Sequence, residues 1–578
     1  MLSGRGISSY EISGTISRYP VRVTLFIILL VAGFLRLVKF GQSPPGLNQD
    51  EAVNGWNAYC LLKTGKDQHG VSWPVYYIQG LGGNGSTLYM YLTIPFQAIG
   101  GLNITTTRLP GAIGGIFTVL IIYLTGKRLF DKETGLLASL LLTLNPWHLQ
   151  QSRWGHEASI CALLGIAPLA MLLWAGLPIS GAKTNGPRPV LAGLAGIISG
   201  ICCYGYQSVR IFVPFFLMVV VLLMMPEWRR SIKTRKGFWA IAAFMFGFAM
   251  MFGPLFWQHV FHPEGISRNA IAQNKVGYFL ADAAPLTAVK NIFIRYIRHF
   301  GPDFLFIHGD YLPLQSPPGI GVFHWYMLPL MVLGLIVILK TFRSASVRLA
   351  LAFVIAYPIG DSLYQMVGMH ALRSAPGTCG LILLAALGGV ETARWLWRRR
   401  REAGLVAVSA FFTSVIILNI QHFYRFYFLF NVHPSIYNLF NKDLVEACEW
   451  LKPRLGEYDG VFFTTNNFNM PYIITLTAIG YEPNKWFNEP QEFTTSDIWD
   501  YYTRYGKMHF IYKNSYVSSL ISLQQSNPAS RILFIIRPGE FNLGEPIHRI
   551  IRTDGKEVLW ICEPPKIGEN SQQRRPEQ

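Results

Sequence analysis

The sequence predicts an α-helical polytopic membrane protein that carries a smaller α/β domain at its C-terminal end. Of its 578 residues, 51% are hydrophobic, which is more than a soluble protein of this length normally carries. Long apolar segments recur between residues 21 and 423, and beyond them short apolar runs alternate with polar stretches. Lys and Arg collect in alternate connections between the apolar segments, a pattern typical of cytoplasmic loops.

The apolar segments are long enough to be transmembrane helices. A helix needs roughly 20 mostly apolar residues to cross a bilayer, and about eleven segments meet that criterion. They are 21–40, 108–126, 134–150, 158–179, 189–206, 209–225, 237–256, 324–342, 346–364, 374–395 and 403–423. The first lacks a small-residue cleavage site after a short apolar core, so we interpret it as a retained helix.

The basic residues predict the orientation of the chain. Lys127, Arg128 and Lys132 lie in one connection, and the run Arg398 to Arg401 lies in another of the same set. With the N-terminus also cytoplasmic, an odd number of spans places the C-terminal domain outside. We therefore expect an integral plasma (inner) membrane protein. The formal charge of +18 follows from these loops, so nucleic acid is not an expected partner.

These patterns divide the chain into three parts. Residues 1–423 form the transmembrane domain, with long outer loops at 41–107 and 257–323. Residues 424–566 form the extracytoplasmic α/β domain, and 567–578 a disordered tail. Five short apolar runs predict strands in the α/β domain, at 461–465, 509–512, 532–536, 547–551 and 558–562.

Two adjacent carboxylates, Asp50 and Glu51, follow the first predicted span directly. Neighbouring acids repel one another unless they share a proton or a cation, so the pKa of one of them can rise and that group can act as a base. The alternative is structural. Asp50 stands where a capping residue would begin a helix over 52–62, and acids there favour the helix dipole. The sequence alone leaves both interpretations open.

A second polar group follows the third predicted span, where Arg153, His156 and Glu157 lie close together. A further acid and an arginine at the same surface favour a functional site. The alternative is interfacial anchoring, with Trp147 and Trp154 at the headgroup level and Arg153 extended toward water.

Several cations lie on the outer side, where the positive-inside tendency disfavours them. They are Arg36, Lys39, Arg108, Arg210 and Arg373, the last of which lies beside His370. A guanidinium can hold a phosphate through two parallel hydrogen bonds. Any one of these side chains could simply reach toward the headgroups, but several on one side predict an anionic ligand.

Four strings of residues resemble the polyprenyl-phosphate-dependent glycosyltransferases of the GT-C fold. They are Leu47 to Ala52, Thr107 to Pro110, Asn145 to Trp147 with Ser152 and Arg153, and Phe304 to Asp310. Within that fold the chain looks most like the branch with the protein O-mannosyltransferases (glycosyltransferase family 39) and the lipid A aminoarabinose transferases. The resemblance covers about residues 1–400 and is strongest over 45–160.

The resemblance implies an inverting transfer of sugar from a polyprenyl-phosphate donor to a hydroxyl of a protein, lipid or glycan acceptor. Asp50 then matches the catalytic aspartate and Glu51 its neighbour, and Glu157 stands where relatives often have a further acid. We expect contacts with the donor phosphate or sugar from Arg36, Arg108, Arg153, His156, His370 and Arg373. Acceptor or loop candidates are Asp67, His69, His308 and Asp310.

No cofactor is expected. A divalent metal is compatible with three acids, but neither a His-rich spacing nor a C-x-x-C pair among the seven cysteines indicates one. The alternative function is a polytopic transporter with an outer accessory domain. Against it, the acids lie in outer loops, and Asp361 comes nearest to an intramembrane acid.

Overall fold

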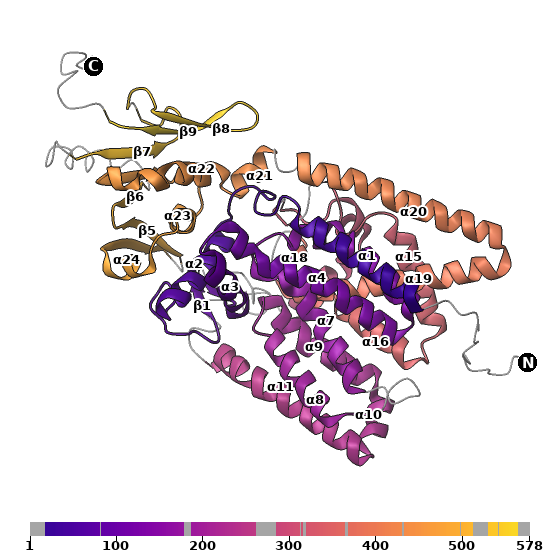
Figure 1. Ribbon diagram of the computed structural model, residues 1–578. Coiled ribbons are helices and arrows are strands. Elements are labelled where there is room, and N and C mark those ends of the chain that lie inside the picture. The colour runs from indigo at the N-terminus through magenta and orange to yellow at the C-terminus, as the bar shows by residue number, and fades with distance from the viewer. Residues whose placement is uncertain are drawn as a thin grey trace, which may run out of the picture.

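The computed structural model of the protein consists of a large helical body and a C-terminal sheet domain (Figure 1). The structure describes residues 18–80, 83–177, 186–261, 285–312, 314–315, 319–364, 368–429, 433–496, 499–511, 530–541 and 543–564. The predicted disordered tail at 567–578 lies outside the described residues.

Seven helical segments of the described chain are long and apolar enough to cross a membrane. They are Pro20–Leu37 of α1 (Arg18–Leu37), α4 (Ile104–Leu129), η1 with α7 (Glu157–Ala175), α11 (Arg235–Phe261), α16 with α17 (Ala345–Ser362), α18 with α19 (Ala371–Arg399) and α20 with its π-helical end (Arg401–Tyr427). An eighth span results if α9 (Gln207–Leu223) and α10 (Met225–Ile232), which meet at 81°, are counted together. The chain is therefore an integral membrane protein.

Three shorter apolar helices coincide with further predicted spans. They are α5 (Lys132–Thr143), α8 (Pro189–Cys202) and α15 (Met327–Lys340). Each is shorter than the roughly 20 residues that a straight crossing needs, so the total of about eleven spans stays a prediction.

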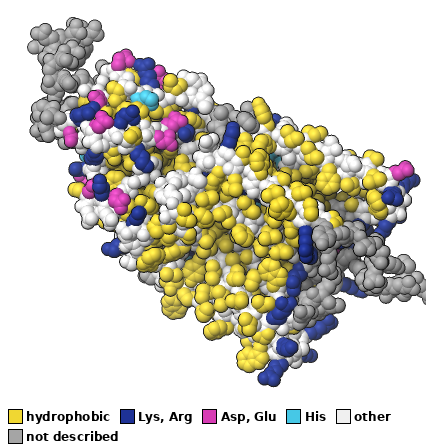
Figure 2. Space-filling model, viewed as in Figure 1, with side chains coloured by type: hydrophobic (Ala, Val, Ile, Leu, Met, Phe, Trp, Pro, Cys, Tyr) yellow, Lys and Arg dark blue, Asp and Glu magenta, His cyan; other side chains and the backbone are white. Residues whose placement is uncertain are grey.

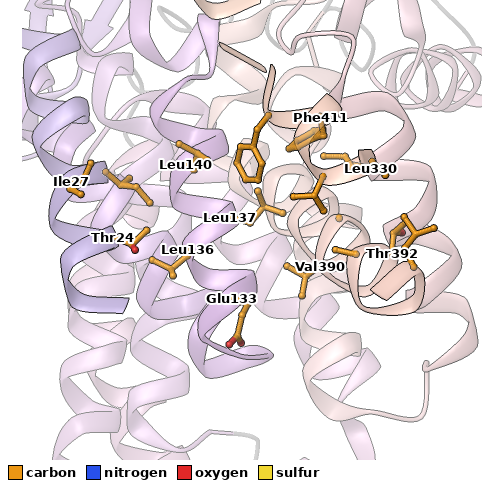
Figure 3. A pocket seen from close by; sticks show the side chains of 17 residues that line it. Thr24, Ile27, Glu133, Leu136, Leu137, Leu140, Leu330, Val390, Thr392 and Phe411 are labelled. Atoms are coloured by element: carbon orange, nitrogen blue, oxygen red, sulfur yellow. The ribbon is translucent and has the colours of Figure 1, made fainter. Parts of the chain in front are cut away.

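The outside of the helical body is apolar. Figure 2 shows hydrophobic side chains over its middle, Lys and Arg at the edge away from the sheet domain, and charges of both signs on the sheet domain. A groove of about 590 Å³ opens on this surface between α1, α5, α15, α19 and α20, and Ile27, Leu140 and Phe411 are among its apolar lining residues (Figure 3). Most of its lining is apolar, with Glu133, Thr24 and Thr392 as the polar exceptions, so such a groove suits a hydrocarbon chain of the bilayer.

Short elements gather between the helical body and the sheet domain. They include α2 (Gln49–Thr64), the hairpin of β1 (Ile78–Gly80) and β2 (Gly83–Gly85), and α3 (Thr87–Gly100) (Figure 1). The connection after α11 adds α14 (Pro285–Arg298) and the π-helical turn η2 (Asp303–Ile307). We call this side of the molecule the domain end.

The C-terminal domain is built on one mixed sheet in the order β4-β5-β6-β3-β7-β9-β8. Its centre is parallel, formed by β6 (Met508–Ile511), β3 (Gly460–Thr464) and β7 (Ile532–Ile536). These strands, together with β8 (His548–Ile551) and β9 (Glu557–Cys562), coincide with the five predicted runs. The sequence did not predict β4 (Gln491–Ser496) and β5 (Trp499–Tyr505), which pair antiparallel at one edge.

One hydrophobic core joins α2 to the sheet domain. The helix packs against α23 (Pro471–Ile479) and α24 (Pro483–Asn488), and its Trp56 meets Trp486 edge to face at 6.0 Å between ring centroids. The buried Trp486 also donates its Nε1–H to the carbonyl of Gln68 at 2.9 Å. Because the core is shared, the position of α2 depends on the C-terminal domain.

Replacing Trp486 by Ala tests this dependence. Loss of a buried Trp side chain costs about 3–5 kcal/mol, so the variant should unfold at a lower temperature in detergent. Trp239→Ala, which removes a side chain that is 57% exposed on the apolar surface, serves as the control. Equal melting temperatures for the two variants would contradict a shared core.

Candidate functional site

The acid pair lies in the first turn of α2, which begins at Gln49. Asn48 is the N-cap. Its side chain accepts a hydrogen bond from the N–H of Asp50 at 3.0 Å, and its own N–H donates to Glu51 Oε2 at 3.1 Å. This reciprocal arrangement is a capping box. The interpretation of Asp50 as the capping residue is therefore wrong, because Asn48 makes the cap two residues earlier.

Glu51 is fully buried and its carboxylate has a complete set of donors. Oε1 accepts from Arg108 Nε at 2.7 Å and from the N–H of Gly155 at 2.6 Å. Oε2 accepts from Arg108 Nη2 at 2.9 Å and from the N–H of Asn48. Four donors fill the acceptor sites of a carboxylate, so groups of the protein itself use the hydrogen-bonding capacity of Glu51.

Arg108, also fully buried, is held in the same way. Besides the two bonds to Glu51, its Nη1 donates to the carbonyl of Pro44 at 2.8 Å and its Nη2 to that of Gly46 at 2.9 Å. The ion pair thus connects α2, α4, the turn at 44–46 and the loop that contains Gly155.

Asp50 differs from its neighbour, because its side chain is 41% exposed. Its Oδ2 lies 3.7 Å from His156 Nε2. His156 Nδ1 accepts a hydrogen bond from the N–H of Ala158 at 2.9 Å, so in the neutral ring the proton is on Nε2, the nitrogen nearest Asp50.

The surroundings shift the pKa values of both groups. Desolvation, followed by the negative charge of Glu51, raises the pKa of Asp50 to about 6. Burial lowers the pKa of His156 to about 3, which keeps the imidazole neutral at physiological pH. Asp50 is therefore a carboxylate whose pKa lies near neutrality, and the nearby imidazole carries no charge to pair with it.

Glu157, the first residue of η1 (Glu157–Ile160), contributes a second acid. Ser86 Oγ donates to its Oε1 at 3.4 Å, and the charge of Arg210 lies within electrostatic range. Arg210 Nε donates to the carbonyl of Cys203 at 3.2 Å, and its Nη1 lies 3.4 Å from His259 Nε2. Among the described residues Arg210 Nη2 has no hydrogen-bond partner, although the side chain is buried.

Tyr206 links this group to a second cation. Its ring meets the ring of His156 at 5.4 Å, and its hydroxyl bonds to Arg373. The guanidinium of Arg373 lies 3.9 Å from the ring centroid of Tyr364 and 3.9 Å from Asp361 Oδ1. Contacts therefore run without a break from Asp50 through His156 and Tyr206 to Arg373.

Behind Arg373 lies a buried polar network. Asp361 Oδ2 is 2.7 Å from Arg295 Nη2 and 3.0 Å from His299 Nε2, and it accepts the N–H of His370 at 3.1 Å. Asp310 lies 3.8 Å from His370 Nδ1. Burial raises the pKa of Asp310 to about 7, although hydrogen bonds from two backbone N–H groups oppose that shift.

The structure places two other predicted cations away from this group. Arg153 donates to the carbonyls of Leu35, Val38 and Ser43, where it caps the end of α1. Arg36 is buried and bonds to His148 Nδ1 at 2.8 Å.

The loop candidates also lie apart from Asp50. Asp67 accepts the N–H groups of His69 and Val71 in the turn beyond the other end of α2, and the ring of His69 bonds to Gln68. His308 is exposed and lies 2.5 Å from Asp303.

The structure thus brings together the predicted residues Asp50, His156, Glu157, Asp310, His370 and Arg373. Tyr206, Tyr364 and Arg295 join them although the sequence analysis did not select them. A sequence signal for Tyr206 was available, because it ends the predicted span 189–206 only four residues before Arg210. Among the described residues no group of three or more His, Cys, Asp and Glu side chains could hold a metal ion.

Comparisons with known proteins bear on this arrangement. Residues 86–257 match the family model described as dolichyl-phosphate-mannose-protein mannosyltransferase. The comparison with curated proteins gives no match. ArnT from Cupriavidus metallidurans, solved bound to undecaprenyl phosphate, is 12% identical, with a TM-score of 0.50 over 94% of this chain and 98% of that chain.

Two other solved structures are similar at lower TM-scores. The oligosaccharyltransferase of Archaeoglobus fulgidus is 13% identical (TM-score 0.46, 81% of this chain), and this chain covers 64% of its length. The Pmt1-Pmt2 protein O-mannosyltransferase complex of S. cerevisiae, bound to its sugar donor, is 14% identical (TM-score 0.32), over 42% of this chain and 34% of that chain. Together, the family model and the fold shared with ArnT confirm that this membrane protein resembles the GT-C glycosyltransferases, as its sequence motifs predict.

Proposed function

We propose that the protein is an inverting glycosyltransferase that moves a sugar from a polyprenyl-phosphate donor to an acceptor hydroxyl at the outer face of the membrane. The observation that carries the proposal is the contrast between the two adjacent acids. Glu51 is buried and accepts four hydrogen bonds, whereas Asp50 is partly exposed and has a pKa raised to about 6.

In this proposal Asp50 is the general base. Its carboxylate removes the proton of the acceptor hydroxyl while the hydroxyl oxygen forms a bond to the anomeric carbon. The bond from that carbon to the phosphate oxygen breaks, and the prenyl phosphate leaves from the opposite face. A single displacement of this kind inverts the anomeric centre and needs one carboxylate.

The negative charge that develops on the leaving phosphate needs cations. Arg210, with a guanidinium nitrogen that lacks a partner among the described residues, and Arg373, beside Tyr206, are the cations we assign to it. We assign Arg108 and Arg153 structural roles instead, because Glu51 and backbone carbonyls occupy their guanidinium groups. We assign the same role to Arg36, because it bonds to His148 and to the carbonyl of Ala32 in its own helix. Glu157 lies near both Asp50 and Arg210, so we assign it to acceptor orientation.

The orientation in the membrane is part of the proposal. Lys and Arg gather at the edge of the helical body away from the sheet domain, which supports a cytoplasmic position for that edge (Figure 2). The domain end, and with it Asp50, then faces outside. Nucleotide sugars are cytoplasmic, so a sugar donor at this face requires a carrier lipid.

The transporter alternative has less support. Asp50, Arg210 and Arg373 lie within the first turns of α2, α9 and α18, and Glu157 begins η1. Ionisable groups that mark a transport path lie near the middle of the bilayer, often on broken helices.

Asp50→Asn should abolish transfer without loss of donor binding. Removal of a general base lowers kcat by about 10²–10⁴-fold, while the groups that hold the donor remain. The assay uses proteoliposomes with a panel of undecaprenyl- and dolichyl-phosphate sugars and follows release of the polyprenyl phosphate. Asp554→Asn, in the turn between β8 and β9, is the matched control. Near-normal turnover by Asp50→Asn would exclude Asp50 as the base.

The rate should depend on the protonation of Asp50. A base acts in its ionised form, so kcat/KM should fall tenfold per pH unit as the pH drops below about 6, the raised pKa of Asp50. An acid with the ordinary aspartate pKa would place that fall near pH 4 instead. The measurement is a pH–rate profile at acceptor concentrations well below KM, and a profile flat down to pH 4.5 would contradict the assignment.

Glu51→Gln should behave differently from Asp50→Asn. It leaves the buried charge of Arg108 unpaired, which typically costs about 3–5 kcal/mol. We expect poor recovery of folded protein, measured by size-exclusion chromatography in detergent, whereas Asp50→Asn should be recovered like the wild type. If Glu51→Gln yields folded protein that binds donor but does not transfer sugar, Glu51 takes part in the chemistry.

A further inference from the structure

The short segment that joins the helical body to the sheet domain lies directly against the residues before Asp50. This segment, residues 439–442, connects α21 (Pro434–Leu439) with α22 (Lys442–Leu451). The N–H of Leu47 donates to the carbonyl of Phe440 at 2.6 Å, and Asn441 Nδ2 donates to the carbonyl of Leu47 at 3.0 Å. Two hydrogen bonds thus join parts of the chain that lie nearly 400 residues apart.

The two backbones approach too closely for side chains to separate them. A Cβ added at Gly46, where φ is +65°, would lie 2.3 Å from the carbonyl oxygen of Phe440 and 2.8 Å from the Cα of Lys442. Asn441 itself adopts the left-handed conformation, with φ 44° and ψ 43°. Asparagine and glycine tolerate this conformation better than other residues, so the sequence at both positions fits the contact.

A third hydrogen bond carries the contact to Asp50. Asn48 Nδ2 donates to the carbonyl of Leu439 at 3.1 Å, which fixes the side-chain amide so that its Oδ1 faces the N–H of Asp50. The 439–442 segment therefore holds both the backbone before α2 and the side chain that caps it.

The same segment also contacts the other side of the site. The Phe440 ring lies 5.8 Å from the guanidinium carbon of Arg108 and 6.3 Å from the ring of Trp154. Trp154 in turn packs on His156 at 4.5 Å. Phe440 thus contacts Arg108 of the ion pair directly and the imidazole that faces Asp50 through Trp154.

We propose that Asn441 is a positioning residue for the transfer reaction, through which the C-terminal domain holds the first turn of α2 so that the Asp50 carboxylate faces its reaction partners. This inference rests on the proposed function for its kinetic consequence. Its structural part, that Asn441 immobilises residues 46–50, stands without that function. Small displacements of a reacting group cost large factors in rate, so a role of this kind acts on kcat.

The test compares Asn441→Gly with Asn438→Ala in the full-length protein. The glycine keeps the left-handed backbone but removes the amide that bonds Leu47. Asn438 is exposed one turn earlier, and its backbone carbonyl, which alanine retains, accepts the N–H of Asn441 at 3.0 Å. Hydrogen–deuterium exchange over residues 45–52 should speed up by about 3- to 10-fold in Asn441→Gly, as expected for one lost hydrogen bond, and stay unchanged in Asn438→Ala.

Kinetics supply the second readout. For Asn441→Gly we expect kcat to fall by about tenfold or more at unchanged donor KM. The acid limb of its pH–rate profile should also move to lower pH, because a mobile Asp50 gains water. If the variant merely contained a smaller fraction of active enzyme, kcat would fall. The acid limb of the pH–rate profile and the exchange rate over residues 45–52 would then stay as in the wild type. Gly46→Ala, which forces the two segments apart, should reproduce all three changes.

The outcomes separate the two proposals. If the wild type transfers no sugar from any donor, the proposed function fails, and the exchange measurement still decides whether Asn441 holds residues 46–50. If the wild type transfers sugar and Asn441→Gly matches it in exchange, kcat and pH profile, the positioning role is excluded and the proposed function stands.

Discussion

The buried ion pair between Glu51 and Arg108 is the interaction on which the geometry of the site depends. Two charges removed from water are costly unless further hydrogen bonds satisfy them, and here every oxygen of Glu51 and three guanidinium nitrogens of Arg108 have partners. Those partners are backbone groups of the turn at 44–46, of Asn48 and of Gly155. Because the pair tolerates little displacement, it fixes four chain segments relative to one another.

The same pair explains why the adjacent acids Asp50 and Glu51 differ so much in their burial and in their partners. Consecutive residues of an α-helix point about 100° apart, so when Glu51 faces the protein interior, Asp50 must face another direction. There it meets a neutral imidazole and solvent instead of a guanidinium. The charge of Glu51 remains close enough to disfavour a second negative charge, which contributes to the raised pKa of Asp50. One acid thus organises the site and leaves the other available.

The sequence predicted those parts of the fold that follow local rules. A bilayer demands long apolar helices, so most predicted spans coincide with helices, and the buried runs of the sheet domain were found for the same reason. Strands β4 and β5 were missed because Gln491–Ser496 at the sheet edge and Trp499–Tyr505 beside it both lack an unbroken apolar run. Helix α14 was missed because Lys290 and Arg295 divide its 14 residues into apolar runs that are too short for a predicted span.

The residue types of the site could be predicted from the sequence, but the directions in which their side chains point could not. Residue types and order selected Asp50, Glu51, Glu157 and Arg373, which the structure does gather at the domain end. No sequence pattern could show that Arg153 turns toward the end of α1 while Arg210 keeps a nitrogen without a partner among the described residues. The contacts of Asn441 were equally out of reach, because they depend on a domain that folds far along the chain.

The core shared by α2 and the sheet domain has a consequence for biogenesis. Ribosomes deliver residues 47–61 to the membrane long before they make the α23 and α24 residues that cover Trp56. Until α23 and α24 have been made, this early segment has no permanent cover for its apolar side chains. Folding of this region is therefore complete only after the final domain has been made and has docked, so truncated translation products leave the apolar side chains of α2 uncovered.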